Sequence, residues 1–253
     1  MHPTSVVSLD AELGDGVRIG PFCVVHPGVV VGDGCIVDSH CVLGAPTSSF
    51  YEAPAAYEPP ACRVEAGSLI RSHTVVYAGA EIGEQFECGH HVTIRERTRI
   101  GTGVRVGTRS DVQGDVTVGD FCRLHSNVFV AKHSTIEDFV WLLPNVTLAN
   151  DPHPPSDTCT RGPTIRRYAV VSANAMVFPG VEIGEGALVG AMALVRHDIP
   201  ARSVAVGAPA QIVGSTADVR CRDGRLGRVY PWWTHFRRGY PDGVLPPADA
   251  GLD

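Results

Sequence analysis

The sequence contains little charge and no feature that would attach it to nucleic acid or to a membrane. Charged residues make up 19% of its 253 residues, and the net charge is −6 with a pI near 6.0. Nucleic acid and anionic membrane surfaces select basic patches, so we expect neither as a partner. Residues 1–16 contain no basic segment and no long apolar run, which predicts neither secretion nor a membrane span and favours a cytoplasmic location.

Familiar catalytic and redox motifs are missing as well. There is no GxGxxG or GxxxxGK[ST] motif for a nucleotide, and no GxSxG motif for a serine nucleophile. The eight cysteines form no CxxC pair, which predicts free thiols in a reducing compartment. The function therefore has to be inferred from the pattern of the chain as a whole.

The dominant pattern has a period of six residues. Stepping by six through residues 70–142 reaches an apolar residue at each of thirteen positions. The same frame holds over residues 7–37 and 171–195, which gives 24 hexads in all. Neither a helical period of 3.6 nor simple alternation produces this pattern, whereas a short strand and a turn, repeated along the chain, do. We therefore predict an all-β repeat fold.

The repeat resembles that of the hexapeptide-repeat acyltransferases, which fold as a left-handed parallel β-helix. The resemblance implies three hexads per triangular coil, and so about eight coils within a domain of residues 1–213. Two segments rich in proline, residues 44–67 and 149–169, break the frame and are predicted insertions. Residues 214–253 contain no hexads, and we expect a C-terminal extension that packs on this triangular prism or on a neighbouring subunit.

The frame also assigns the cysteines. Five fall on inward positions and are predicted core residues: Cys23, Cys35, Cys41, Cys88 and Cys122. The other three are placed in loops or in the tail: Cys62, Cys159 and Cys221.

One corner of the predicted coil is unusually polar. In such a coil, residues eighteen apart stack vertically. At the corner that contains residues 71–73, 89–91, 107–109, 125–127 and 143–145, most turn glycines are replaced by His, Ser, Arg and Asn. Two stacks result, one of His73, His91, Arg109, Asn127 and Asn145, the other of Ser72, His90, Thr108, Ser126 and Pro144. A polar column that the scaffold does not require is the strongest indication of a site. A solvated polar ladder is the alternative interpretation.

Two segments at this corner carry a closer resemblance. Residues 123–156 resemble the nucleotide-sugar N-acetyltransferases, whose "IED…P…TND…P" run is matched by Ile136–Asp138, Pro144 and Asn150–Asp151. "CGHHVT", residues 88–93, resembles a hexad of sugar acyltransferases that use acyl carrier protein. In that hexad the third residue, here His90, is the general base. The resemblance implies an acetyl-CoA-dependent N-acetyltransferase acting on a nucleotide-linked amino sugar, as a homotrimer with sites between adjacent prisms.

The same resemblance assigns roles to individual residues. His90 is the predicted catalytic base, His125 or His133 are alternatives, and some members of the group use no side-chain base. The predicted substrate-binding residues are His91, His125, Ser126, Asn127, His133, Asn150 and Asp151. Acetyl-CoA is the expected co-substrate, along the C-terminal coils at Ala173, Ala191, Arg196 and Arg202. No metal is expected.

Three other functions stay open at this point. The chain could transfer a longer acyl group from acyl-CoA or acyl carrier protein, to nitrogen or to oxygen. It could be a non-catalytic β-helix scaffold, although a scaffold has no need of histidines at a corner. A zinc enzyme of the carbonic-anhydrase type needs two histidines five residues apart, and no pair of histidines has that spacing.

Overall fold

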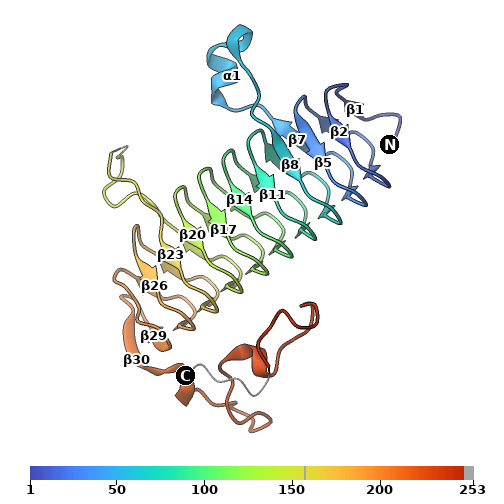
Figure 1. The fold of residues 1–253 in the computed structure, drawn as a ribbon. Coiled ribbons are helices and arrows are strands. Elements are labelled where there is room, and N and C mark those ends of the chain that lie inside the picture. The colour runs from blue at the N-terminus through green and yellow to red at the C-terminus, as the bar shows by residue number, and fades with distance from the viewer. Residues whose placement is uncertain (157, 248–253) are drawn as a thin grey trace.

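The predicted left-handed parallel β-helix is confirmed by a computed structural model that describes residues 1–156 and 158–247. Strands β1 to β29 run parallel and form three flat sheets, which are the faces of a triangular prism (Figure 1). The strands are short because each hexad gives one outward and one inward residue before the chain turns. No helix among the described residues is long and apolar enough to cross a bilayer.

Sheet A contains β1 (Val6–Val7), β4 (Val24–Val25), β7 (Val42–Ala45), β10 (Val75–Tyr77), β13 (Thr93–Ile94), β16 (Asp111–Val112), β19 (Phe129–Val130), β22 (Thr147–Leu148), β25 (Met176–Val177) and β28 (Leu194–Val195). Sheet B contains β2 (Glu12–Leu13), β5 (Val29–Val31), β8 (Cys62–Val64), β11 (Glu81–Ile82), β14 (Arg99–Ile100), β17 (Thr117–Val118), β20 (Thr135–Ile136), β23 (Thr164–Ile165) and β26 (Glu182–Ile183). Sheet C contains β3 (Arg18–Ile19), β6 (Ile36–Val37), β9 (Leu69–Ile70), β12 (Glu87–Cys88), β15 (Arg105–Val106), β18 (Arg123–Leu124), β21 (Trp141–Leu142), β24 (Val170–Val171), β27 (Leu188–Val189), β29 (Ser203–Val206) and the antiparallel β30 (Gln211–Ser215).

The coils stack in register, so that residues eighteen apart are direct partners. Ile94 of β13 pairs with Val112 of β16, for example, and both are fully buried. One apolar residue per hexad thus lies in a continuous core along the prism axis. Burial of these aliphatic side chains, each contributing about 1.5–3 kcal/mol, is the main force that holds the coils together.

The number of coils differs from the prediction. Sheet A has ten strands, so the prism has ten coils on that face rather than eight. The strands that the hexad count left out contain Leu43, Val64, Leu148, Ile165 and Ala205. Four of these strands adjoin the two insertions and the fifth lies in the closing segment, where proline and glycine obscure the repeat.

Both insertions are shorter than predicted. The first excursion spans residues 46–61 and contains α1 (Ser48–Glu52) and the 3₁₀ turn η1 (Pro54–Ala56), which project from the prism (Figure 1). The chain is back in the sheet at β8, so the placement of Cys62 in a loop was wrong: its side chain is fully buried. The second excursion spans residues 149–163 and ends where β23 begins.

The cysteines are free thiols, as predicted. Six of the eight are buried, and Cys159 and Cys221 lie at or near the surface. Burial raises the pKa of Cys122 to about 12, so this thiol stays protonated and unreactive near neutral pH.

The extension packs on the prism of its own chain. β30 pairs antiparallel with β29, and the 3₁₀ turn η2 (Thr216–Asp218) follows. The chain then returns along sheet C to the turn η3 (Trp232–Thr234), drawn in red in Figure 1. A cluster of five aromatic residues and one leucine, which we call the aromatic cluster, joins the two parts: Phe139, Tyr168, Trp232, Trp233, Tyr240 and Leu245.

Candidate active site

The corner between sheet C and sheet A has non-glycine residues at turn positions where the backbone conformation favours glycine. At each of nine coils one residue of this corner, which we call the C–A corner, has a positive φ, and none of the nine is glycine: Phe22, His40, His73, His91, Arg109, Asn127, Asn145, Asn174 and Met192. A left-handed conformation costs an L-residue about 1–2 kcal/mol, a penalty that glycine avoids. Glycine does hold several equivalent turn positions between sheets B and C, such as Gly16, Gly34 and Gly103.

His90 and His91 lie side by side on this corner and have different surroundings. The Nδ1 atom of His90 is 2.8 Å from the hydroxyl of Ser72, and the backbone N–H of His90 donates to the Thr108 hydroxyl at 3.2 Å. His91 instead stacks its ring on that of His73, with centroids 4.6 Å apart. The contact with Ser72 orients the His90 ring, so that Nε2 is the nitrogen left for a reacting group.

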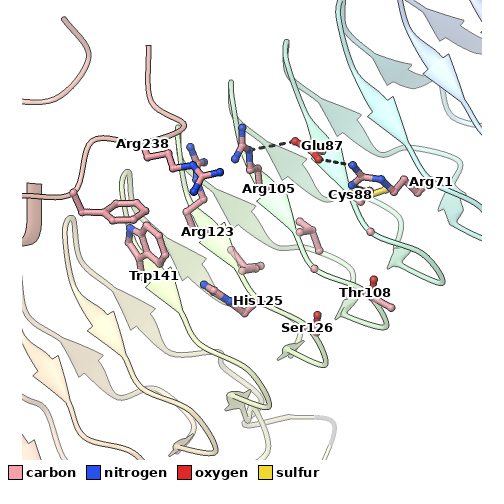
Figure 2. Close-up of a pocket in the computed structure, with 15 residues that line it drawn as sticks. Arg71, Glu87, Cys88, Arg105, Thr108, Arg123, His125, Ser126, Trp141 and Arg238 are labelled. Atoms are coloured by element: carbon pink, nitrogen blue, oxygen red, sulfur yellow. Dashed lines mark hydrogen bonds and ion pairs between the residues drawn. The ribbon is translucent and has the colours of Figure 1, made fainter. Parts of the chain in front are cut away.

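A groove of about 560 Å³ opens on sheet C directly beside the C–A corner. Its corner side is lined by Thr108, His125 and Ser126 (Figure 2). Thr108 and Ser126 belong to the same stack as His90, and the His90 backbone N–H donates to the Thr108 hydroxyl, although His90 itself does not line the groove. The groove and the polar corner therefore form one candidate site.

His125 is the half-buried histidine of this site. Its ring lies 5.6 Å from that of Trp141, and burial lowers the pKa of the imidazole. His125 is thus neutral near pH 7 and can accept or donate one hydrogen bond to a ligand.

The floor of the groove is a ladder of outward side chains on sheet C. Glu87, Arg105, Arg123 and Trp141 are register partners on β12, β15, β18 and β21. The carboxylate of Glu87 accepts from Arg71 at 2.8 Å and from Arg105 at 3.3 Å. The ladder holds charged groups in fixed positions beside the corner.

Arg123 is exceptional within the ladder because it is only 6% exposed. Its guanidinium donates to backbone carbonyls, among them those of Gly103 and Gly239, each at 2.7 Å. Burial lowers the pKa of Arg123, but an arginine side chain stays protonated in proteins near pH 7. A positive charge is therefore held below the surface of the groove.

The structure separates some of the predicted substrate residues from His90. Asn127 stays at the C–A corner, where its Oδ1 accepts from Arg109 Nε at 3.1 Å. His133, Asn150 and Asp151 instead follow strands of sheet A and lie at the opposite edge of that sheet within one chain.

Asp151 already has partners in its own loop. Its carboxylate accepts from the backbone N–H groups of His153 at 3.1 Å and Ser156 at 2.8 Å. These contacts fix the start of the second insertion. Because both oxygens of the Asp151 carboxylate accept backbone hydrogen bonds, few acceptor positions remain for a ligand.

Two of the predicted cofactor residues share a corner with His90. Ala173 and Ala191 follow β24 and β27 at the C–A corner, four and five coils beyond the coil of His90 on β12. At about 4.8 Å per coil, the nearer alanine is roughly 19 Å from His90 along the prism. Arg196 lies over the ring of Phe178 at 5.7 Å, and Arg202 is a turn residue whose carbonyl accepts from Thr216.

The sequence interpretation missed the charged ladder and the part of the site that comes from the extension. The eighteen-residue spacing of Glu87, Arg105 and Arg123 could have revealed the ladder, because outward positions stack as inward ones do. Nothing in the sequence places Phe236 and Arg238 beside it, where both line the groove. No group of three His, Cys, Asp or Glu side chains suited to a metal occurs within residues 1–156 and 158–247.

Comparison with known proteins supports the repeat and the fold. The family model described as bacterial transferase hexapeptide (six repeats) matches residues 10–45. The serine acetyltransferase of Salmonella typhimurium is 35% identical over 89 residues, which is 35% of this chain and 32% of that protein. A putative serine acetyltransferase of Schizosaccharomyces pombe is 34% identical over 106 residues, covering 41% of this chain and 38% of its own length.

The chain thus spans about a third of the length of these relatives. Among solved structures, the Arabidopsis UDP-N-acetylglucosamine acyltransferase superposes with a TM-score of 0.65 over 85% of this chain and 74% of that one, at 17% identity. Such a likeness shows a shared fold and leaves the reaction to the site itself. With its hexad frame, the repeats matched at residues 10–45 and this shared architecture, the chain has the hexapeptide-repeat β-helix fold.

Proposed function

We propose that the chain is an acyltransferase that uses acetyl-CoA to acetylate the amine of a nucleotide-linked amino sugar. The observation that carries the proposal is the position of His90, which Ser72 orients at 2.8 Å on the corner beside a groove of about 560 Å³. The proposal is also supported by the relatives in sequence and in fold, whose names describe acyltransferases.

His90 would supply general-base catalysis in this reaction. A protonated amine has no lone pair with which to attack a thioester, so His90 Nε2 first takes one proton from it. The neutral amine then forms the carbon–nitrogen bond as the carbon–sulfur bond breaks; the imidazole passes its proton to the leaving thiolate, and the second proton of the nitrogen is released to solvent. Hydroxyl groups of Thr108 and Ser126, which line the groove and belong to the stack of His90, can hold the acceptor by hydrogen bonds.

Two other assignments of the base are compatible with the same site. His125 lines the groove and is neutral near pH 7, as a base must be. An amine that arrives unprotonated would need no side-chain base. His133 can act only if another chain brings it to the groove, since it lies beyond sheet A in its own chain.

The acyl donor is proposed to lie along the C–A corner of the later coils. Ala173 and Ala191 have small side chains there, so an extended arm can approach the backbone closely. Arg196 and Arg202 belong to the same end of the prism and are proposed to interact with the donor phosphates.

A homotrimer would complete this site. His133 and the loop that begins at Asn150 lie at one edge of sheet A, while His90 lies at the other. Threefold packing of prisms would bring the edge with His133 in one copy toward the edge with His90 in its neighbour. Light scattering should give three times the monomer mass of 26.9 kDa, and a monomer would contradict the shared site.

Transfer to a hydroxyl is the second candidate, because the relatives with 34–35% identity are named serine acetyltransferases. Both candidates can be tested in one assay that follows release of the CoA thiol from acetyl-CoA, longer acyl-CoA or acyl carrier protein. Nucleotide-linked amino sugars, free amino sugars and serine serve as acceptors. We expect turnover with an amino sugar that requires His90. Turnover with serine alone would replace N-acetylation by O-acetylation, and no turnover with any pair would favour a scaffold.

A further inference from the structure

The C-terminal extension forms one side of the groove from within the same chain. After pairing with sheet C at the base of the prism, it returns along the sheet and places Phe236 and Arg238 among the lining residues. In Figure 2 the side chain of Arg238 lies in one row with those of Arg123 and Arg105, opposite His125 and Ser126. The extension thereby turns the otherwise open face of sheet C beside the corner into a groove.

The extension is fixed at this position by specific contacts. Trp233 is 1% exposed, and its ring centroid is 4.2 Å from that of Tyr168 on the prism. Arg123 donates to the carbonyl of Gly239 at 2.7 Å and lies 4.3 Å from the ring centroid of Tyr240. These contacts attach the segment around Arg238 to the prism, so that Arg238 is a stable part of the groove.

The groove has a surplus of positive charge in a chain of net charge −6. Its lining contains four arginines and a single carboxylate, that of Glu87, which is shared by Arg71 and Arg105. Arg123 donates only to backbone carbonyls, and Arg238 has no ion pair or hydrogen bond with any residue that the structure describes. Four guanidinium groups beside one carboxylate leave an excess of positive charge in a concave site, which favours an anion with several oxygens, such as a phosphate.

We infer that the extension builds an anion subsite in this groove, in which Arg238 and Arg105 bind the diphosphate of the acceptor. The inference rests on the proposed function, because Thr108 and Ser126 line the groove and the Thr108 hydroxyl contacts the backbone of His90, the proposed base. A diphosphate at the arginine row would direct the sugar toward that corner, while Trp141 and Phe236 offer an apolar wall beside it. The phosphates of the acyl donor are the other possible source of this chemistry. We assign the subsite to the acceptor, because the predicted donor residues lie several coils away.

Binding of UDP to the full chain, measured by calorimetry without acyl donor, tests the subsite. Loss of a charge-assisted contact in Arg238→Ala should weaken UDP binding on the order of tenfold or more. Arg238→Lys should restore part of the affinity, since it keeps the charge and loses the planar fork. Arg222→Ala is the matched control: Arg222 is an exposed arginine of the extension that does not line the groove. Both sites are exposed, so neither change endangers the fold.

Each outcome decides the matter. Weaker UDP binding in Arg238→Ala than in Arg222→Ala supports the subsite, whether or not acyl transfer is found. Equal effects in the two variants, or absence of UDP binding, overturn it, and acetyl transfer to a free amino sugar would then leave the proposed function intact. If Arg238→Ala weakens binding of desulfo-CoA and leaves UDP unaffected, the anion belongs to the donor and the assignment to the acceptor is wrong.

Discussion

The two walls of the groove come from different kinds of sequence and are held in place by different contacts. The corner wall, with Thr108 and Ser126 in the stack of His90, repeats every eighteen residues, and each coil is hydrogen-bonded to the coils before and after it. The wall from the extension has no repeat and depends on one aromatic cluster around Trp233. We therefore expect the first wall to be as stable as the prism, and the second to detach without unfolding of the coils.

The difference suggests a division of labour. Groups that react need fixed geometry, and the corner supplies it through stacked coils. Groups that select a ligand need to differ between proteins with the same scaffold, and an added segment can supply them without changing the repeat. Substitutions in each wall should therefore affect different quantities.

The largest expected effect is on the corner wall. His90→Ala should lower kcat by on the order of 10²–10⁴, because the amine then loses its proposed general base. Binding of acetyl-CoA and the oligomeric state should be unchanged. His91→Ala is the matched control, since that ring stacks on His73 and faces a different neighbour. A loss below about tenfold in His90→Ala would exclude this histidine as the base.

The next effect concerns the attachment of the extension. Trp233→Ala removes the most buried aromatic side chain of the cluster and should cost the docked extension about 3–5 kcal/mol. Amide hydrogen exchange should then show loss of protection in residues 230–247, while β15 and β18 keep theirs. Equal loss in the coils would mean that the two walls unfold as one unit, contrary to the comparison.

A smaller effect is expected from the second insertion. Replacing residues 151–160 by a Gly-Ser linker should raise KM for the amino sugar about tenfold, equivalent to about 1.4 kcal/mol, and leave KM for acetyl-CoA nearly unchanged. The same replacement of residues 48–59 is the control, because that loop leaves the prism at the same edge of sheet A, nearer the N-terminus. If both replacements act alike, or neither does, the second insertion does not belong to the acceptor site.

The smallest effect is a pH dependence of stability through His125. Burial lowers the folded-state pKa of this imidazole, so below about pH 6.5 the unfolded chain binds a proton that the folded chain does not. The stability contribution is present above the unfolded pKa and declines as pH falls toward the folded pKa. Urea unfolding at pH 7.5 and 5.5 should show a smaller loss of stability in His125→Gln than in wild type. An identical loss in both proteins would show that His125 titrates normally.

Much of the prism could be predicted from the sequence, because the hexad is a local pattern. An inward residue such as Ile94 is identified by its spacing alone, and its partner Val112 follows eighteen residues later. The same logic placed His90 in one stack with Thr108 and Ser126. It failed at Val64 and Ile165, where an insertion joins the repeat and the flanking glycines and prolines hide the frame.

The sequence by itself determined the six-residue repeat and the burial of most cysteines, since both depend on residues a fixed number of positions apart, and the resemblance to three-sided coils then implied the stacking of the polar corner. Only the tertiary structure decided that His133 and Asn150 lie across sheet A from His90, and that Arg238 completes a groove with Arg105. These positions depend on contacts between segments far apart in the chain, such as that of Trp232 Nε1 with the carbonyl of Tyr168 at 3.3 Å. No periodicity encodes such contacts, because each one is made by packing of a unique segment on a regular face.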